Sequence, residues 1–270
     1  MKFSLTITKD ASIKFPVILR GDIEKNIRKA KEFGYDAVEI HIENPTLLDL
    51  ENILKVSESE GLKISTLGTG LAFVKEKLSF TDHDEVVREK AVKRVAKFIE
   101  VAKILNAKVI IGSIRGSIPE AKERKKYESF AFECFQKVLD KAEKEEVELL
   151  IEPINRYETN FINTVEEALT LIEKMSSNYL KVHLDTFHMN IEKESFKNSI
   201  LMAKDKLGHF HFADSNRKFP GAGHINFEEI KEALKAINYE GVIAFEYLPL
   251  PDGDTAAMKG LEFAKRLFKI

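Results

Sequence analysis

The chain has 270 residues, of which 44% are hydrophobic and 32% are charged, and its formal net charge is −2. This length suits one large α/β unit, so we expect residues 1–270 to form a single domain. The nearly balanced charge excludes the strong positive field that attracts nucleic acid or an anionic membrane surface.

Signals of a membrane or secreted protein are missing from the sequence. No apolar run approaches the ~20 residues of a membrane span, and the N-terminal MKFSLTITKD lacks a secretory signal. Cys134 is the only cysteine, which excludes a disulfide framework and a cysteine metal site. We therefore expect a cytoplasmic protein. The high charged fraction, rich in Lys and Glu, and the absence of Trp favour a thermophilic source.

Short apolar runs rich in Val, Ile and Phe predict eight β-strands. Several of these runs are apolar on both faces, as the strands of a fully buried parallel sheet are. The predicted strands are residues 3–7, 37–42, 63–68, 108–112, 148–153, 181–185, 209–214 and 242–247.

Amphipathic segments lie between these strands and predict eight helices. Gly34, Gly61 and Gly208 stand where three of them would end. Strict alternation of eight strands with eight helices predicts a (β/α)8 TIM barrel of the α/β class. A doubly wound open sheet is the alternative, although TKDASIKFP follows the first strand in place of a glycine-rich phosphate loop. The predicted helices are residues 22–33, 46–60, 84–105, 123–145, 164–176, 196–206, 227–237 and 255–268.

Four chemically active side chains stand at the ends of four successive strands. They are Glu152, Asp185, His211 and Glu246. The carboxyl ends of barrel strands converge on one mouth, so these groups should meet in space. Three carboxylates at close quarters repel one another unless a cation neutralises them. Carboxylate oxygens with one imidazole nitrogen suit Mn²⁺, Mg²⁺ or Co²⁺, and two positions of an octahedral ion would stay open for a substrate.

The remaining histidines and the cysteine have less specific patterns. His183 and His209 each lie two residues before a candidate ligand, so they should face the same side of the barrel one layer lower. We interpret them as structural or supporting groups. His41 and His224 are interpreted as surface or pocket-wall residues, and Cys134 as a core residue.

Four segments closely resemble the ketose 3-epimerases, the D-tagatose and D-allulose 3-epimerase family of xylose-isomerase-like barrels. The segments are IEPINRYETNF (151–161), LDTFHMNIE (184–192), HFHFADSNR (209–217) and PGAGHINF (220–227). The resemblance covers almost the whole chain. It implies a xylose-isomerase-like fold, a keto-sugar substrate and a homodimer or homotetramer.

Position by position, the resemblance also implies roles for individual residues. Glu152, Asp185, His211 and Glu246 match the family's metal ligands; Glu158 matches a residue near the reactive end of the substrate. His188 and Arg217 match groups that hydrogen-bond the oxygens on its carbonyl side. We expect Mn²⁺ as the cofactor, with Co²⁺ or Mg²⁺ as alternatives. The metal would polarise the C2 carbonyl, and Glu152 and Glu246 would exchange the C3 proton through a cis-enediolate.

The substrate and reaction have several alternatives. EYLPLPDGD (246–254) and GAGHINF (221–227) depart from the main family and resemble a branch acting on keto-acids, such as 5-keto-L-gluconate epimerase. An aldose–ketose or hydroxypyruvate-type isomerase would use the same enediolate. An apurinic endonuclease is disfavoured by the charge and the single histidine ligand, and a non-catalytic sugar-binding barrel by the paired glutamates. Arg115 and Arg156 are either clamps for a substrate carboxylate or phosphate, or surface ion pairs.

Overall fold

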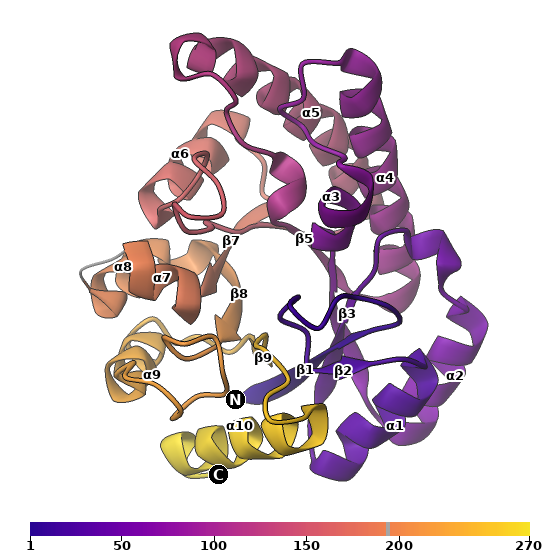
Figure 1. The fold of residues 1–270 in the computed structure, drawn as a ribbon, viewed down its shortest axis with the longest axis vertical. Helices are drawn as coiled ribbons and strands as arrows, with labels where there is room; N and C mark the ends of the chain where they lie inside the picture. Colours follow the sequence, from indigo (N-terminus) through magenta and orange to yellow (C-terminus); the bar gives the residue numbers. More distant parts are fainter. Residues whose placement is uncertain (193–194) are drawn as a thin grey trace.

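The computed structural model describes residues 1–192 and 195–270. Eight parallel strands close into a barrel, because β9 pairs with β1 in parallel register (Figure 1). A ninth strand, β2, is two residues long and extends the sheet beside the end of β1. The strands are β1 Lys2–Thr8, β2 Leu19–Arg20, β3 Ala37–His41, β4 Lys63–Gly68, β5 Lys108–Ile111, β6 Leu149–Ile151, β7 Leu180–Asp185, β8 Leu207–Phe212 and β9 Val242–Phe245.

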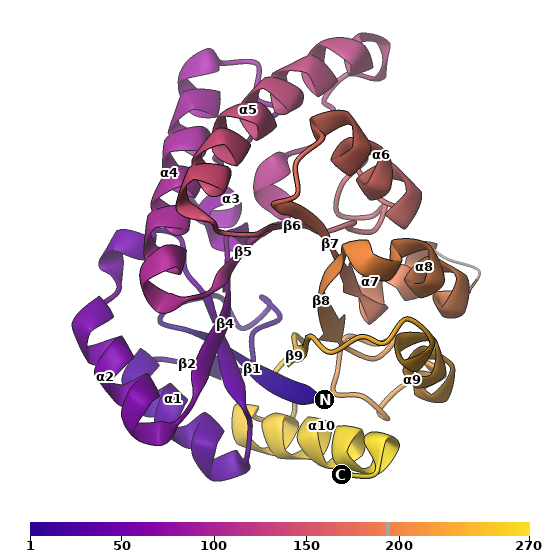
Figure 2. The ribbon, with the colours of Figure 1, turned by 180° about the vertical axis from the view of Figure 1, so that it is seen from behind.

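Helices surround the barrel on its outside (Figures 1 and 2). Within the described residues, no helix is both long and apolar enough to cross a bilayer. The α-helices are α1 Ile23–Phe33, α2 Leu50–Glu60, α3 Gly70–Glu76, α4 Glu85–Leu105, α5 Arg124–Glu145, α6 Val165–Met175, α7 Thr186–Glu192, α8 Phe196–Ala203, α9 Phe227–Ala236 and α10 Gly253–Phe268. Short 3₁₀ helices span Pro45–Leu47, Ser113–Arg115, Ala121–Glu123 and Lys204–Lys206.

Local sequence explains why these elements form. Every residue of β1 after Lys2 is buried, since one face of the strand fills the barrel and the other contacts helices. Helix α1 begins after Asp22, whose carboxylate accepts a hydrogen bond from the backbone N–H of Lys25 at 2.8 Å. It ends at Gly34, whose φ of 92° lies in the left-handed region that glycine adopts without strain.

The predicted barrel is confirmed, and the alternative of an open doubly wound sheet is wrong because the sheet closes. Each predicted strand has an observed counterpart, displaced at its ends by at most two residues. Predicted helix 46–60 is instead a 3₁₀ turn followed by α2, which begins after a second capping residue, Asp49. The predicted role of Gly208 is wrong. It lies inside β8, where a Cβ atom would come within 2.6 Å of Leu150.

Two short helices, α3 and α7, were not expected. Helix α7 begins directly after β7 and α3 begins one residue after β4 ends, both at the end of the barrel where the strands finish. Helix α7 follows Asp185 without a connecting loop, and this turn brings His188 back over the barrel mouth. The chain therefore surrounds the mouth with short elements that carry polar side chains.

Candidate active site

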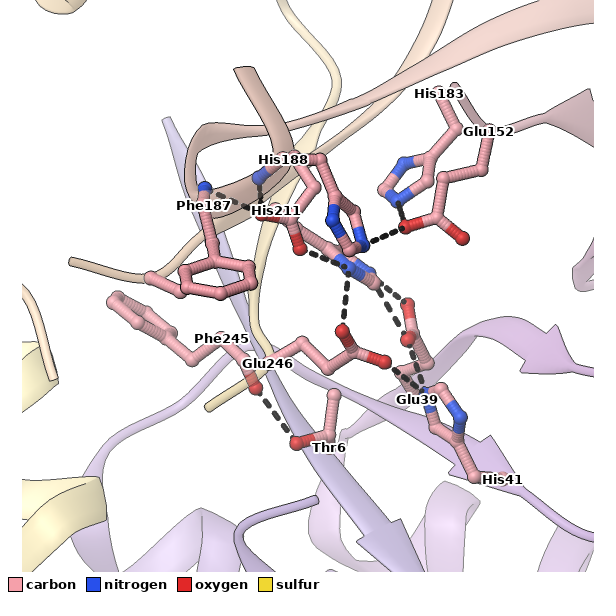
Figure 3. Close-up of polar contacts among 12 residues, drawn as sticks. Thr6, Glu39, His41, Glu152, His183, Phe187, His188, His211, Phe245 and Glu246 are labelled. Carbon is pink, nitrogen blue, oxygen red and sulfur yellow. Dashed lines mark hydrogen bonds and ion pairs between the residues drawn. The ribbon is translucent and has the colours of Figure 1, made fainter. Parts of the chain in front are cut away.

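The four strand-end residues meet at the barrel mouth. Asp185 and His211 lie in β7 and β8, whereas Glu152 and Glu246 directly follow β6 and β9. One ligand atom from each residue lies within 4.8 Å of all the others, and all four side chains are buried. His211 Nδ1 is 3.6 Å from Asp185 Oδ2 and 3.7 Å from Glu246 Oε2 (Figure 3). The sequence prediction that these groups gather is thus reproduced in space.

This donor set fits a divalent cation. Asp185 Oδ2 and His211 Nδ1 are buried, yet neither has a hydrogen-bond partner among the described residues. A buried polar atom without a partner is costly, and both atoms face the centre of the cluster. Three carboxylates and one imidazole nitrogen are suitable ligands for Mn²⁺, Co²⁺ or Mg²⁺.

Burial and neighbouring charges separate the proton affinities of the two glutamates. Burial raises the pKa of Glu152 to about 7, and the charges of Glu246 and Asp185 add to this rise. Burial also acts to raise the pKa of Glu246, but the interactions with His211, His41 and Arg217 together outweigh it and the pKa is lowered. His211 likewise lowers the pKa of Asp185 against the effect of burial. In the metal-free site, a proton therefore binds to Glu152 before Glu246, a difference typical of acid and base partners.

Three further groups that the sequence singled out surround the same space. His188 Nε2 lies 3.7 Å from Glu152 Oε1. Arg217 donates a 2.8 Å hydrogen bond to Glu158 and lies 3.6 Å from Glu246 Oε2. The guanidinium of Arg217 is also 4.6 Å from the ring centroid of Phe187, which holds it against the wall.

Asn155 determines which ring nitrogen of neutral His188 carries the proton. Its Oδ1 accepts from the backbone N–H of Tyr157, and its Nδ2 donates to Glu158 Oε1, so the orientation of the amide is fixed. The same Nδ2 lies 2.7 Å from His188 Nδ1, which must therefore accept. The ring proton of neutral His188 is then on Nε2, which points toward Glu152. We did not single out Asn155 from the sequence, where an Asn in a loop carries no distinctive signal.

A cavity of about 470 Å³ opens above the four strand-end residues. Its wall includes Glu152, Glu158, His188, His211, Arg217 and Glu246, together with Lys14 and Phe15 from the loop after β1 and Gly112 after β5. This volume is suitable for a small sugar. The lack of a side chain at Gly112 leaves room for the carboxylate of Glu152, because a Cβ atom there would lie 2.7 Å from Glu152 Oε2.

The structure also shows what Arg115 and Arg156 contact, which the sequence left open between a substrate clamp and a surface ion pair. Arg156 is exposed and forms an ion pair with Glu192 at 2.8 Å, so the surface-pair interpretation is correct for it. Arg115 is fully buried and is neither a clamp nor a surface pair. It donates to the backbone carbonyls of Gly112, Phe161 and Ile162, each at 2.9 Å.

The other histidines and the cysteine follow the sequence interpretation with one difference. His183 and His209 are buried one layer below the mouth, and Cys134 belongs to the core. His224 is exposed and contacts Ser215. His41 lines the cavity, as the pocket-wall interpretation expects, but it is buried rather than at the surface, and its Nε2 lies 2.6 Å from Glu39 Oε1.

Glu39 is the main residue that the sequence analysis overlooked. Its side chain has no solvent exposure, and it contacts histidines of both β3 and β8. A charged residue in the middle of the apolar run AVEIHI was the available signal, since such a residue is rarely buried without partners.

Known proteins similar to this chain agree with its fold. The family described as xylose isomerase-like TIM barrel matches residues 27–267. The chain is 32% identical to the D-psicose 3-epimerase of Agrobacterium fabrum over 234 residues, 82% of this chain and 77% of that protein. It is 29% identical to the L-ribulose 3-epimerase of Methylomonas sp. over 266 residues, 90% of this chain and 91% of the relative. The crystal structure of a D-allulose 3-epimerase from Methylomonas sp. superimposes with a TM-score of 0.84 at 27% identity, covering 99% of this chain and 98% of the other.

Proposed function

Because the chain belongs to the xylose isomerase-like TIM barrel family and is an epimerase, an enzyme of the isomerase class, we propose that it inverts C3 of a ketose with the help of a divalent cation. The observation that carries this proposal is the meeting of Glu152, Asp185, His211 and Glu246 at one point of the barrel mouth. Relatives named for 3-epimerisation of D-psicose and L-ribulose support a small keto-sugar as the substrate.

Glu152, Asp185, His211 and Glu246 would hold the cation, with Mn²⁺ expected and Co²⁺ or Mg²⁺ as alternatives. When bound, the cation supplies a Lewis acid that polarises the ketose carbonyl and makes the neighbouring C3–H bond more acidic. Its positive charge also offsets the repulsion among three buried carboxylates.

Glu152 and Glu246 are the proposed acid and base. One carboxylate removes the C3 proton from one face of the sugar, giving a cis-enediolate. The other returns a proton to the opposite face, and the roles reverse for the reverse reaction. In the metal-free site the pKa of Glu152 is raised and that of Glu246 is lowered, so the environments of the two carboxylates differ.

His188, Arg217 and Glu158 are the proposed substrate contacts. The Nε2–H of His188 and the guanidinium of Arg217 would donate to the oxygens where negative charge develops. Burial acts to lower the pKa of Arg217, but Glu246 and Glu158 raise it overall, so the group stays charged. Glu158 holds Arg217 through the 2.8 Å hydrogen bond and would accept from a sugar hydroxyl near the reactive end.

One observation favours a keto-aldonate as a second candidate substrate. Lys14 lines the cavity and forms no ion pair within residues 1–192 and 195–270. A cation of this kind would attract a carboxylate at the far end of the substrate. The experiment is a comparison of kcat/KM for free ketoses and 5-keto-aldonates with added Mn²⁺. A preference for the keto-aldonates above about tenfold would select the second candidate.

The proton-transfer proposal is tested by Glu246→Gln, with the same substitution at the exposed Glu240 as the control. We expect the first variant to keep its circular dichroism spectrum and lose at least about 10²-fold in kcat, since general acid–base groups contribute 10²–10⁴-fold. We also expect the wild type to incorporate deuterium from D₂O at C3 of the ketose. Turnover of Glu246→Gln at the wild-type rate, or epimerisation without exchange at C3, would contradict the proposal.

A further inference from the structure

A buried network lies directly beneath the proposed cation site, and Glu39 is at its centre. We propose that Glu39 is a positioning residue that keeps the proton of His211 on Nε2 and so leaves Nδ1 free to bind the cation. This inference rests on the metal site of the proposed function. It concerns the hydrogen bond between Glu39 and His211 Nε2, on the side of the ring that faces away from the proposed cation. None of the proposed substrate contacts takes part in this bond.

The contacts of Glu39 occupy both of its oxygens. His41 Nε2 lies 2.6 Å from Oε1, and His209 Nε2 lies 2.8 Å from Oε2. His211 Nε2 lies between the two oxygens, 3.0 Å from Oε1 and 3.1 Å from Oε2. The hydroxyl of Thr66 donates to Oε2 as well. Figure 3 shows that His41 and His211 approach this carboxylate from different sides.

The chemistry of a carboxylate fixes the proton on each ring. Glu39 has no solvent exposure, and its two oxygens are surrounded by ring nitrogens of three histidines and by the hydroxyl of Thr66. An ionised carboxylate can only accept hydrogen bonds, so each contacting Nε2 must donate. His211 Nδ1 then faces Asp185 and Glu246 at 3.6 and 3.7 Å. A cation held there would take the place of any proton on Nδ1, while the Nε2 proton would stay on His211 and be donated to Glu39.

The same contacts explain three histidines that lie together. Ring nitrogens of His183, His209 and His211 lie within 4.8 Å of one another, which on composition suggests a second metal site. However, Nε2 of both His209 and His211 is engaged by Glu39. His183 packs against them, with ring centroids 5.1 Å from His209 and 4.0 Å from His211. We therefore assign His183 and His209 a structural role, which is to hold the ring plane of His211, and not the binding of a second ion.

Replacement of Glu39 by Gln should act on His211 specifically. The amide of Gln has one oxygen and one NH₂ group, and His211 Nε2 contacts both carboxylate positions, so in either orientation Nε2 keeps one acceptor and faces one donor. The charged acceptor that holds the Nε2 proton is lost, and the NH₂ group favours the tautomer with its proton on Nδ1. In that tautomer Nδ1 is no longer free to bind the cation.

The experiment measures the Mn²⁺ dissociation constant of wild type, Glu39→Gln and Thr66→Val by isothermal titration. Thr66→Val is the matched control, since it removes a hydrogen bond to the same carboxylate without touching His211. We expect Glu39→Gln to weaken Mn²⁺ binding roughly 10–100-fold, the range for loss of a partner behind a metal ligand, and Thr66→Val to change it less than about threefold. Thermal unfolding in EDTA checks that both variants fold.

Three results of the titration would overturn the inference. Glu39→Gln binding Mn²⁺ as tightly as wild type shows that the hydrogen bond is not needed, and equal losses in both variants show a general effect of the network. Wild type failing to bind Mn²⁺ would remove the proposed metal site as well. If Glu39→Gln does not fold, ¹⁵N-histidine NMR of the wild-type Mg²⁺ complex gives the answer directly. We expect a protonated Nε2 on His211, assigned by its loss in His211→Asn, and a deprotonated Nε2 would contradict the proposal.

Discussion

Proton positions on single side chains control what this site can donate or accept. Asn155 gives the clearest case, since its amide contacts Tyr157, Glu158 and His188 and so has one allowed orientation. Its donation to His188 Nδ1 leaves Nε2–H directed at the cavity. The same rule applies to His211 with the opposite outcome, because there the carboxylate of Glu39 holds the proton on Nε2 and exposes Nδ1 to the cluster.

A double-mutant cycle tests the role of Asn155. We expect Asn155→Leu to lower kcat/KM roughly tenfold, about 1.4 kcal/mol, because His188 loses the partner that fixes its ring. If Asn155 acts through His188, the double variant with His188→Leu should be no worse than His188→Leu alone. Losses in kcat/KM that simply multiply would show that Asn155 acts elsewhere.

The segments that follow β5 and β6 are joined by one buried side chain. Arg115 reaches from the 3₁₀ helix Ser113–Arg115 to the carbonyls of Phe161 and Ile162. Ile162 has φ of 59°, an unusual conformation for a β-branched residue. The hydrogen bonds of Arg115 offset that strain and satisfy carbonyls that water cannot reach. This contact connects the strand end carrying Gly112 with the loop after Glu152.

Arg115→Met should therefore destabilise the fold rather than change substrate recognition. We expect a loss of at least about 3 kcal/mol in the free energy of unfolding, because three buried carbonyls lose a donor. Arg124→Met is the control, since Arg124 is exposed and pairs with Glu128 at the surface, where about 0–1 kcal/mol is typical. Urea denaturation of both variants gives the comparison, and a loss below about 1 kcal/mol for Arg115→Met would refute the structural role.

The eight barrel strands and the four groups at their ends could be predicted from the sequence. Buried parallel strands are apolar runs, and their order along the chain is their order around the barrel.

Helices α3 and α7 were not predictable, since seven residues are too few to show a periodic apolar face. Glu39 was overlooked because two of its partners, Thr66 and His209, come from other strands, β4 and β8, and His209 is distant in the sequence and meets it only when the barrel closes. Manganese, the oligomeric state, the cytoplasmic location and the thermophilic source stay predictions.

Taken as a whole, the molecule concentrates buried charge at one end of an apolar barrel. Asp185, Glu152 and Glu246 share a small volume there, so a bound cation should stabilise the entire fold by linkage. We expect Mn²⁺ at 100 times its dissociation constant to add about 2.7 kcal/mol. For a chain of this size that corresponds to a rise in Tm of roughly 5–10 °C over the EDTA-treated protein.

Asp185→Asn supplies the control for this shift, because it removes a ligand while keeping the shape of the side chain. Differential scanning calorimetry should show no Mn²⁺-dependent rise in Tm for that variant. A rise as large as in wild type would mean that the ion stabilises the protein from another place.

Buried neutral histidines give the metal-free protein a defined sensitivity to acid. Burial lowers the pKa of His183 and of His209 to about 3. Their ordinary value of about 6.5 applies in the unfolded chain, which therefore binds more protons below that pH. The stabilisation is complete above pH 6.5 and is lost progressively as the pH falls toward 3.

His183→Leu isolates this effect, because neither ring nitrogen of His183 has a hydrogen-bond partner among the described residues. Between about pH 6 and 4, the free energy of unfolding of wild type should fall more steeply than that of the variant by about 1.4 kcal/mol per pH unit. Urea denaturation in EDTA at several pH values provides the slopes, and identical slopes would show that His183 is not held neutral.

Anomalous diffraction at the manganese edge, from a crystal soaked in Mn²⁺, tests the proposed cation site most directly. We expect one peak per chain at the barrel mouth, within about 2.5 Å of a donor atom from each of Glu152, Asp185, His211 and Glu246. The nitrogen nearest that peak should be His211 Nδ1. A peak at the His183–His209 pair, or a manganese ion bound away from these four side chains, would contradict it.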